Sequence, residues 1–455
     1  MIVVSFSGTS GGDVERVAQA IEIVAGRREQ QPIVVVSALD GVTSDLVAAS
    51  EAAQGQDPDR VASIIGAVRQ RHEDVARRLV FNKSDFIDAF LRQLDQQIDE
   101  IKTILSGIAL LGEITPRGRD KVISIGEKLS SVLLAYSMRI RTLPAQPVSS
   151  EELIWTDDRF GGAEPLMDLT RDAVRRVLLP LLARDRIPVM GGSIGRTRQG
   201  ATTTLGRYGA DYSAAVVGAA LGADEVQIWT DVDCLMTCDP RLVSGARIIE
   251  RLSFAEAAEL AGFGAKLHPR TLEPAVIAGI PVRVLNTHNP SSRGTLITRE
   301  GDPSGSGPRS IARKTGITIV HVASNKMLGV HGFLAKLFGV FDQLAISVDV
   351  ITTSEISVTV TIDDRHNVEE LENRLNDLGK VELLENQSIV AVVGTNLKRE
   401  SIIGARVFEA LRGMRFQMVS LSSSGLNLSI VVPDAHSERA VQALHAAFFE
   451  DAANV

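Results

Sequence analysis

Apolar and polar positions along the first forty residues predict two strands joined by a helix. An apolar run covers residues 2–6, and the turn-rich segment SGTSGGD follows it. A helical periodicity extends from Val14 to Ala25, and a second apolar run covers residues 33–37. Because both runs are mostly apolar, they are typical of strands buried in a parallel sheet. The opening is therefore predicted to be a βαβ unit, whose first loop is a favoured place for phosphate.

Similar periodicities continue through the first two thirds of the chain. Residues 57–136 are charged and helically periodic, with few turn signals outside residues 115–119, and they predict several helices. Strand-like runs then alternate with helical patterns, which predicts an α/β fold with an open, mostly parallel sheet flanked by helices. The predicted strands are 187–190, 225–230 and 282–285, and the predicted helices are 211–221 and 254–261.

The last third contains an internal repeat. Displacing the chain by 70 residues aligns its apolar positions without a gap. Each copy predicts a strand, a loop, a helix and two alternating strands, and two such βαββ copies indicate paired sheets. The aligned pairs are Phe338 with Phe408, Phe341 with Leu411, Ile346 with Phe416, Ser354 with Ser424, Ile356 with Leu426 and Val358 with Leu428.

The repeat follows a linker and resembles a known sensing module. Residues 301–308, GDPSGSGP, have the composition of a linker, so the major domain boundary is placed there. The repeated unit resembles the ACT domain, whose sheets pair edge to edge and bind an amino acid between them. A structural repeat used only for dimerisation is the alternative, and the pattern alone favours neither.

The bulk composition limits the class of partner. At 455 residues the chain is too long for one core, so two or three domains are expected. The hydrophobic share of 44% is typical of a soluble globular protein, while the aromatic share of 4% and the net charge of -8 disfavour nucleic acid. Nucleotide phosphates are still compatible, because helix N-termini and a few basic side chains bind small anions regardless of net charge.

Cysteine usage and hydropathy predict a cytoplasmic protein that does not bind to a membrane. Cys234 and Cys238 are the only two cysteines, and they fit neither a zinc cage nor a disulfide framework, so no metal held by protein ligands is expected. No apolar run reaches the ~18 residues that a membrane span needs. The chain opens on a strand pattern rather than on a basic segment followed by an apolar stretch.

The loop after the first predicted strand has the composition of an anion site. Residues 8–12 offer backbone N–H groups and hydroxyls with little side-chain bulk, directly before a helix N-terminus. This arrangement suits a phosphate group. A plain strand-to-helix turn is the alternative interpretation.

Three later segments also carry candidate residues. Arg207 and Asp211 lie in a glycine-containing turn before an alanine-rich helix. An arginine at this place can bind a substrate carboxylate. The aspartate can act on the substrate, or it can only cap the helix. Asp231 and Asp239 follow a predicted strand, where α/β sheets place ligands, although both are also common turn formers. Lys266 can bind a phosphate group, or it can be an exposed surface lysine without such a role.

In their order along the chain and in their amino-acid sequences, these segments resemble those of the aspartokinase family. The resemblance spans nearly the whole chain and continues through residues 327–358, which look like the first ACT domain of the lysine-sensitive type. The segments that carry it are SFSGTS (5–10), SALDGVTSDLV (37–47), SIGEKLSS (124–131), DDRFGGAEP (157–165), GRTRQGATTTLGRYGADYSAA (195–215), WTDVDCLMTCDPR (229–241), FAEAAELAGFGAKLHPRTLEPA (254–275) and IPVRVLNTHNPSSRGTLI (280–297).

The resemblance implies an amino acid kinase fold that phosphorylates L-aspartate, or a related acidic small molecule, with ATP and Mg²⁺. Such a reaction mainly requires alignment and positive charge around the moving phosphoryl group. The resemblance implies that the ATP phosphates are bound by Gly8, Thr9 and Ser10, next to Ser5, and that the nucleotide is also contacted by Thr230, Asp231, Arg241 and Lys266. It implies that aspartate is bound by Thr43, Glu127, Phe160, Gly161 and Arg207. Asp211 would act at the centre of phosphoryl transfer.

For the last third, the resemblance implies an amino acid effector, with lysine as the first candidate. Asp349 would be a natural partner for its ammonium group, and a homodimer or a dimer of dimers would form through the ACT domains. The implied effector residues are Met327, Gly332, Phe333, Leu334, Ser347, Val348 and Asp349. The predicted domains are the kinase at 1–300, a linker at 301–311, and ACT domains at 312–385 and 386–455, with interleaving of the C-terminus into the first ACT domain left open.

The sequence departs from the family pattern at functional positions. The family loop reads Lys-Phe-Gly-Gly-Thr-Ser, and here Ser5 occupies the lysine position and Ser7 a glycine position. Losing one preorganised charge of this kind typically costs about 10²- to 10³-fold in rate. Tyr208 replaces a glycine and Ala210 a serine near the acceptor, and Val330 replaces a serine in the ACT segment.

Three hypotheses therefore stand beside one another. The first is a working, slower ATP:aspartate phosphotransferase, favoured because the other assigned residues are present. The second is a kinase acting on a different carboxylate or amino acid, motivated by Tyr208 and Ala210. The third is a pseudokinase that senses an amino acid without catalysis, motivated by Ser5.

Overall fold

The computed structural model folds into two compact units. It describes residues 1–7, 13–79, 84–206, 209–231, 234–263, 269–303, 305–328, 331–363, 367–399 and 401–450. The first unit consists of Met1–Cys234, Glu250–Phe254 and His268–Gly301, and the second of Leu235–Ile249, Ala255–Leu267 and Asp302–Val455. Two short segments upstream of the predicted linker thus belong to the second unit.

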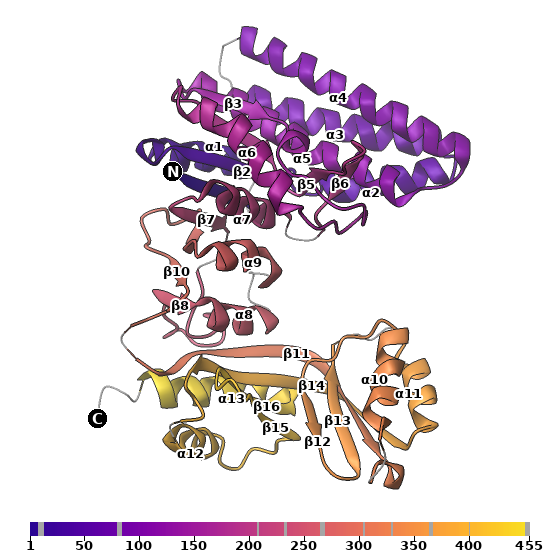
Figure 1. Ribbon diagram of the computed structural model, residues 1–455, viewed down its shortest axis with the longest axis vertical. Helices are drawn as coiled ribbons and strands as arrows, with labels where there is room; N and C mark the ends of the chain where they lie inside the picture. Colours follow the sequence, from indigo (N-terminus) through magenta and orange to yellow (C-terminus); the bar gives the residue numbers. More distant parts are fainter. Residues whose placement is uncertain are drawn as a thin grey trace. The chain divides into compact units, whose positions relative to one another are not determined.

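The first unit is built on one mostly parallel sheet (Figure 1). In the part of the chain that the structure describes, its strand order is β3-β4-β2-β1-β7-β9-β10-β8, and β10 runs antiparallel to β9. The central strands β1, β2 and β4 are almost entirely buried, which explains why their residues are mostly apolar. The strands are β1 Ile2–Phe6, β2 Pro32–Val36, β3 Ala145–Val148, β4 Ile187–Gly191, β7 Glu225–Thr230, β8 Arg251–Ser253, β9 Val282–Asn286 and β10 Thr295–Thr298, with a separate hairpin of β5 Ile194–Arg196 and β6 Thr202–Thr204.

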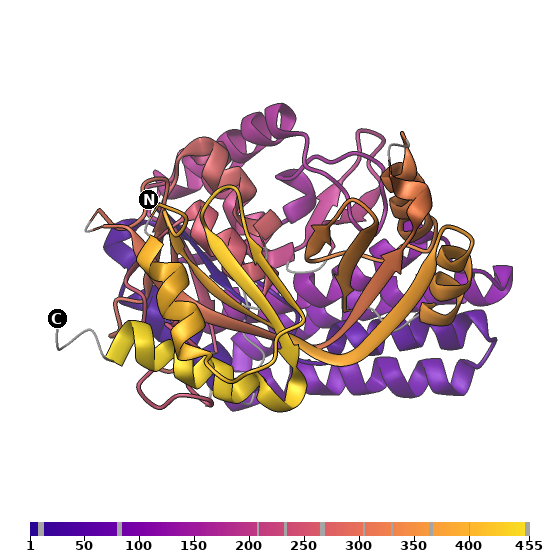
Figure 2. The same ribbon diagram turned by 90° about the horizontal axis from the view of Figure 1, so that it is seen from below.

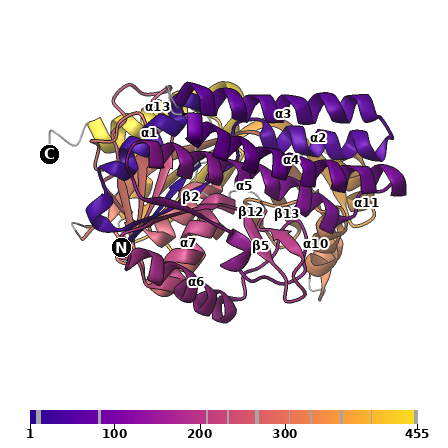
Figure 3. The same cartoon turned by 90° about the horizontal axis from the view of Figure 1, so that it is seen from above.

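Helices cover both faces of this sheet (Figure 3). Five helices form one apolar core with β2 and β4, while α6 and α7 pack on one another and α7 packs on β1 and β2. Thr115 caps the start of α5 by accepting a hydrogen bond from the Gly118 N–H, and Pro116 follows at the first helical position. The helices are α1 Asp13–Ala25, α2 Val42–Gln54, α3 Pro58–Leu79, α4 Ser84–Leu111, α5 Pro116–Ile140, α6 Met167–Leu182, α7 Gly209–Leu221 and α9 Pro269–Ala278.

The second unit contains one antiparallel sheet that carries two pairs of helices. Its order within the described residues is β12-β13-β11-β14-β16-β15, and Figure 2 shows the orange and yellow helices at opposite ends of its two long strands. The helix-strand-strand order of α10, β12 and β13 recurs in α12, β15 and β16, as the 70-residue repeat predicts. The elements are β11 Gly307–Ala323, α10 Phe333–Gln343, β12 Ile351–Thr353, β13 Ser357–Ile362, α11 Val368–Asn376, β14 Lys380–Thr395, α12 Ser401–Ala410, β15 Met418–Leu421, β16 Asn427–Pro433 and α13 Asp434–His445.

The two faces of this sheet are covered by different parts of the chain. Helices α10 and α11 pack on one core, and α12 and α13 pack on another, both on the same side. On the other side, Phe263 and Val350 pack against Ile319 and Ile389. Phe263 follows helix α8 (Phe254–Gly262), so α8 leads into the face that the other helices leave uncovered.

Among the residues described, no helix is both long enough and apolar enough to cross a membrane.

Candidate active site and effector site

Four parallel strands of the first unit end at the same edge of the sheet. Ser7 follows β1, Ser37 follows β2, Gly192 follows β4 and Asp231 follows β7. The strands β2, β1 and β7 are direct neighbours, so these residues gather at one edge. This is the edge at which open α/β sheets bind ligands.

Ser5 and Asp211 form a buried contact below this edge. The Ser5 hydroxyl donates a hydrogen bond of 2.7 Å to Asp211 Oδ1, and the Ser7 side chain hydrogen-bonds the same carboxylate. Burial raises the pKa of Asp211 to about 6, while the two serine hydroxyls act against that rise. The position at which the family has a lysine therefore supplies a neutral donor to Asp211.

Glu127 is a second buried carboxyl group in this unit. It lies on α5 with 8% of its surface exposed, and its Oε2 has no hydrogen-bond partner among the described residues. Burial raises the pKa of Glu127 to about 7. A buried carboxyl oxygen without a partner is costly, so a ligand that donates a hydrogen bond or brings a positive charge would stabilise it.

Glu127 faces a large cavity of about 1190 Å³. Thr43 of α2 lines the cavity together with Phe160 and Gly161 of the loop before α6, so four of the five predicted aspartate contacts converge there. The fifth, Arg207, lies outside the described residues. Ser7 also lines the cavity, which places the end of β1 beside the predicted acceptor site.

Asp120 holds the wall of this cavity together, and the sequence analysis did not identify it. Its carboxylate is buried and accepts hydrogen bonds from the Gly161 N–H at 2.9 Å, the Thr204 N–H at 2.8 Å and the Thr204 hydroxyl at 2.8 Å. Asp120 precedes Glu127 by seven residues on α5, so both lie on one helix face. That spacing is the signal that the sequence offered.

The loop that carries Phe160 is also anchored from outside the cavity. Glu164 accepts a hydrogen bond of 3.1 Å from the Tyr212 hydroxyl and forms an ion pair with Arg270. The Arg270 guanidinium lies 5.8 Å from the centre of the Tyr212 ring. Tyr212 is the neighbour of Asp211 on α7, and Arg270 opens α9, so one carboxylate links the loop to two helices.

The loop before Thr43 is held by two other helices. Arg71 of α3 donates a hydrogen bond to the Asp40 carbonyl, and Asp13 of α1 accepts one of 3.4 Å from the Asp40 N–H. Gly41 adopts a φ of 74° and its Cβ position would lie 3.2 Å from Arg71, so this turn favours glycine. Thr43, the second residue of α2, therefore follows a fixed turn.

The predicted nucleotide contacts are only partly described. Gly8, Thr9, Ser10 and Lys266 lie outside the described residues. Thr230 ends β7, and its hydroxyl donates a hydrogen bond of 3.2 Å to Asp231 Oδ1.

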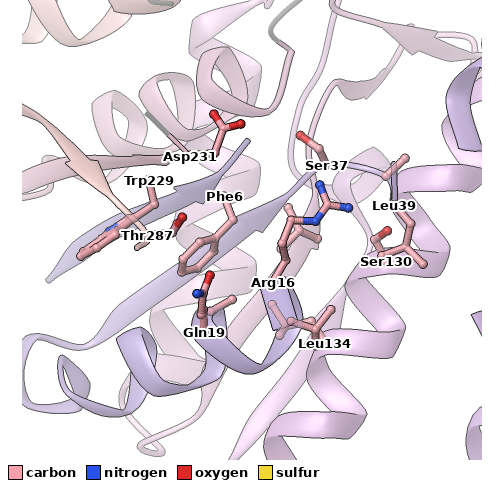
Figure 4. Close-up of a pocket in the computed structure, with 14 residues that line it drawn as sticks. Phe6, Arg16, Gln19, Ser37, Leu39, Ser130, Leu134, Trp229, Asp231 and Thr287 are labelled. Atoms are coloured by element: carbon pink, nitrogen blue, oxygen red, sulfur yellow. The ribbon is translucent and has the colours of Figure 1, made fainter. Parts of the chain in front are cut away.

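Asp231 also lines a smaller cavity of about 80 Å³ beside α1. Figure 4 shows Arg16, Ser37 and Ser130 on one side of this cavity, and Trp229 and Thr287 on the other. The predicted nucleotide residue Asp231 thus lines one cavity together with Arg16 and Gln19 of α1.

Arg241 is assigned to a different unit from these residues. Arg241 belongs to the second unit, where its exposed guanidinium pairs with Asp239 at 2.6 Å. Its nucleotide role stays a prediction.

The predicted effector residues point in two directions. Met327, Phe333 and Val348 pack into the core below α10, and Gly332 starts that helix with a φ of 80°. Asp349 faces the other side, where both of its oxygens accept hydrogen bonds of 2.8 Å from Lys314. The predicted ammonium partner therefore has a cation of its own in this structure. The remaining two residues, Leu334 and Ser347, are exposed.

A metal site built from protein ligands is not found among the described residues, because no group of three or more His, Cys, Asp or Glu side chains could hold an ion. Nucleotide-bound Mg²⁺ needs only one or two carboxylates besides the phosphates, and Asp211 and Asp231 are carboxylates of this kind near the strand edge.

Comparisons with known proteins agree with this architecture. The amino acid kinase family profile matches residues 1–286, and the ACT domain profile matches residues 320–369 and 390–448. The chain is 37% identical to aspartokinase 3, chloroplastic, of Arabidopsis thaliana over 98% of this chain and 81% of that protein.

Two solved structures of one bacterial enzyme match almost the whole chain. Escherichia coli aspartokinase III in complex with aspartate and ADP, in the R-state, is 35% identical with a TM-score of 0.81, covering 99% of this chain and 100% of that one. The same enzyme in complex with lysine and aspartate, in the T-state, is 35% identical with a TM-score of 0.85, covering 98% of this chain and 99% of that one.

Proposed function

Because this chain belongs to the aspartokinase family, we propose that its first unit transfers the γ-phosphoryl group of ATP to the β-carboxylate of L-aspartate. The product is aspartyl 4-phosphate. The observation that best supports this proposal is the buried carboxyl group of Glu127, whose unpartnered oxygen faces a cavity shared with Thr43 and Gly161.

In this proposal Glu127 binds the α-ammonium group of aspartate. Its carboxyl group has a pKa of about 7 because it is buried, and a nearby ammonium group would return it to the charged form. Thr43, Phe160 and Gly161 hold the rest of the substrate, and Arg207 binds its α-carboxylate. Asp120 acts only by positioning the Gly161 backbone.

Phosphoryl transfer needs alignment and charge compensation rather than covalent work by the protein. Asp211 orients the serine hydroxyls at the end of β1, and Thr230 and Asp231 lie on the nucleotide side. Mg²⁺ bound to the nucleotide would supply positive charge to the phosphate oxygens. Ser5 adds none, so we expect a rate below that of a homologue with lysine at this position.

We also propose that the second unit regulates the kinase. Its ACT domains would bind an amino acid, lysine first, and would join two copies of the chain. The support is the family membership together with the Escherichia coli enzyme, whose solved T-state complex contains lysine. The domain limits at 312–385 and 386–455 are part of this proposal.

Hydroxamate trapping tests the proposed reaction. The purified chain is incubated with ATP, Mg²⁺, L-aspartate and hydroxylamine, and aspartyl hydroxamate is expected to form at a rate proportional to enzyme. A variant with Glu127→Gln should need far more aspartate, with a KM raised by at least tenfold, because it loses a charged partner for the ammonium group. Product formation without aspartate, or with no dependence on Glu127, would refute the proposal.

Two other outcomes correspond to other functions. Turnover with a different acid would indicate a changed acceptor, which is favoured by the methyl group of Ala210 packed against Gly192 in the cavity wall. ATP binding without any product would indicate a pseudokinase, which is favoured by the neutral Ser5 beside Asp211.

A further inference from the structure

A half-buried carboxylate joins α5 to the hairpin of β5 and β6. Glu151 lies in the short 3₁₀ helix that follows β3, and its Oε1 accepts a hydrogen bond of 2.5 Å from the Thr202 hydroxyl of β6. The same oxygen lies 3.2 Å from the ammonium group of Lys128 and 3.7 Å from that of Lys121, both on α5. One carboxylate oxygen therefore contacts β6 and two successive turns of the α5 surface.

Glu151 is placed by close contacts at the end of β4. Its neighbour Ser150 is buried and donates a hydrogen bond of 2.5 Å to the Gly191 carbonyl. Gly191 in turn lies directly against the α5 backbone, because a Cβ at this residue would come within 2.8 Å of the Glu127 carbonyl oxygen. The 3₁₀ helix, β4 and α5 are thus packed too closely for Glu151 to be displaced without moving its neighbours.

The contacts of Glu151 are charged and partly shielded from water. The side chains of Glu151 and Lys128 are only 24% and 20% exposed. Burial raises the pKa of Glu151, but Lys128 and the Thr202 hydroxyl outweigh this effect and keep the pKa below its ordinary value. The carboxylate is therefore ionised at neutral pH, and a hydrogen bond to an ionised group is stronger than one between neutral groups.

Strand β6 is held against α5 at two positions. Side chains alternate along a strand, so Thr202 and Thr204 point to the same side of β6. Thr202 donates to Glu151, which is paired with α5, and Thr204 donates at 2.8 Å to Asp120 of α5 itself. Both threonines are buried. Of these four residues, only Thr204 and Asp120 line the acceptor cavity, so Glu151 and Thr202 act from behind its wall.

The two elements joined in this way lead to the two ends of the proposed acceptor. Glu127, the proposed partner of the ammonium group, lies on α5. Beyond Thr204, the Leu205 N–H donates a hydrogen bond of 2.9 Å to the Ser193 carbonyl, and the Gly206 carbonyl accepts one of 3.3 Å from the Ser193 hydroxyl. The next residue in the sequence is Arg207, the proposed partner of the α-carboxylate.

We propose that Glu151 is a positioning residue for the acceptor, which fixes the distance between Glu127 and the end of β6 that leads to Arg207. An α-amino acid is bound through its ammonium and carboxylate groups at once, so its affinity depends on this distance. A dicarboxylic acid without an ammonium group does not use both partners. The inference rests on the proposed aspartate site and adds the residue that gives this site its selectivity for α-amino acids.

Thr202→Val tests the role of the hydrogen bond, because valine has a similar shape but no hydroxyl. The Kd and the KM for L-aspartate should rise by about three- to tenfold, while kcat should change by less than about twofold. The Kd for succinate, which lacks the ammonium group, should stay unchanged. Thr202→Ser keeps the hydroxyl and should recover most of the affinity. Isothermal titration calorimetry measures Kd, with displacement titrations for succinate, and the hydroxamate assay measures KM and kcat.

Ser137→Ala is the matched control for the loss of a buried hydroxyl. Ser137 lies on α5, and its hydroxyl donates only to the Leu133 carbonyl of the same helix. This variant should lose a comparable hydrogen bond without changing the Kd for L-aspartate. An equal Kd in Thr202→Val and Ser137→Ala would overturn the proposal.

Glu151→Gln and the double variant show whether the two residues act together. Loss of the charge weakens the contacts to Thr202 and Lys128, so Glu151→Gln should also raise the Kd for L-aspartate by about three- to tenfold. If Glu151 acts through Thr202, adding Thr202→Val to Glu151→Gln should weaken binding no further. Losses that simply add in the double variant would contradict the shared role.

Binding and turnover distinguish this inference from the proposed reaction. An unaltered chain that binds L-aspartate but forms no hydroxamate would refute the reaction, and the Kd values of the variants would still decide the role of Glu151. Turnover in the unaltered chain with unchanged Kd and KM in Thr202→Val and Glu151→Gln would refute the positioning role alone. An unaltered chain that does not bind L-aspartate would overturn both.

Discussion

At the scale of single residues, the unusual feature is a hydroxyl where the family has an ammonium group. Ser5 is fully buried, and its hydroxyl has one short contact, to Asp211. This contact satisfies the carboxylate without adding positive charge. Catalysis in such a pocket depends on how much charge other groups supply to the phosphoryl group.

Restoring that charge should raise the rate. We expect Ser5→Lys to increase kcat in the hydroxamate assay by about 10²-fold, the typical worth of one preorganised charge or donor. Ser5→Met has a similar length without the charge, so it should not increase kcat. A Ser5→Lys enzyme that is no faster than the unaltered chain would show that this protein compensates the charge by another route.

Glu127 should make the stability of the ligand-free protein depend on pH. Its pKa in the folded state, about 7, lies above the ordinary value of 4.5, so the folded state binds its proton more tightly. The resulting stabilisation is fully present below pH 4.5 and is lost as the pH rises through 7, and it amounts to about 3 kcal/mol.

Urea unfolding of the unaltered chain and of Glu127→Gln, at pH 5 and pH 8, measures this contribution. The Gln variant should gain relative stability at pH 8, because it avoids burying an unpaired charge. An equal difference between the two proteins at both pH values would contradict the assigned pKa shift.

At the scale of elements, the loop Asp157–Glu164 depends on partners from three helices. Asp120 of α5 fixes its Gly161 backbone, and Glu164 joins it to Tyr212 of α7 and Arg270 of α9. Arg270 follows the segment with the predicted nucleotide residue Lys266. The loop therefore connects the acceptor side of the site to α9.

We expect Arg270→Gln to raise the KM for aspartate by about three- to tenfold, the effect of losing about 1 kcal/mol of hydrogen bonding that positions the loop. The melting temperature should hardly change, because both partners are partly exposed and such pairs add little stability. Arg270→Lys should recover part of the loss. Arg171→Gln, which breaks an exposed pair on α6, is the matched control, and an equal KM in both variants would argue against the positioning role.

At the scale of the whole molecule, two segments of the kinase sequence belong physically to the second unit. Residues 235–249 and 255–267 lie within the range matched by the amino acid kinase profile, yet they fold with the ACT sheet. The second segment contains most of α8, and Phe263 at its end packs on the apolar sheet face. The boundary of the amino acid kinase profile in the sequence therefore does not coincide with the boundary between the two compact units of the structure.

An effector that binds the second unit should stabilise it. L-lysine at one hundred times its Kd would add about 2.7 kcal/mol to the free energy of unfolding, which corresponds to a shift of roughly 5 to 10 °C in Tm for a body of this size. Differential scanning fluorimetry with L-lysine, and with D-lysine as a control of equal charge, measures the shift. No shift with L-lysine, or equal shifts with both, would contradict a specific lysine site.

Much of the fold follows from short stretches of sequence. The apolar run at residues 2–6 and the periodicity at 14–25 correspond to β1 and α1, because strand and helix periods are visible within about ten residues. The convergence of Thr43, Glu127 and Gly161 on one cavity agrees with the family resemblance. Asp120 was missed, because in sequence a buried carboxylate that holds a distant loop and the distant strand β6 differs from other helix residues only by its spacing from Glu127.

The sequence by itself determined the family, the α/β and α+β elements, the repeat and the loss of a lysine at residue 5, because each depends on residue identity or on local period. Only the tertiary structure decided that Ser5 donates to Asp211, that Arg270 reaches Glu164, and that Asp349 pairs with Lys314. These partners are separated by 206, 106 and 35 residues. Contacts between such distant residues depend on the topology of the fold, which is the order in which strands and helices are connected and placed beside one another. The topology is set by the packing of all elements together.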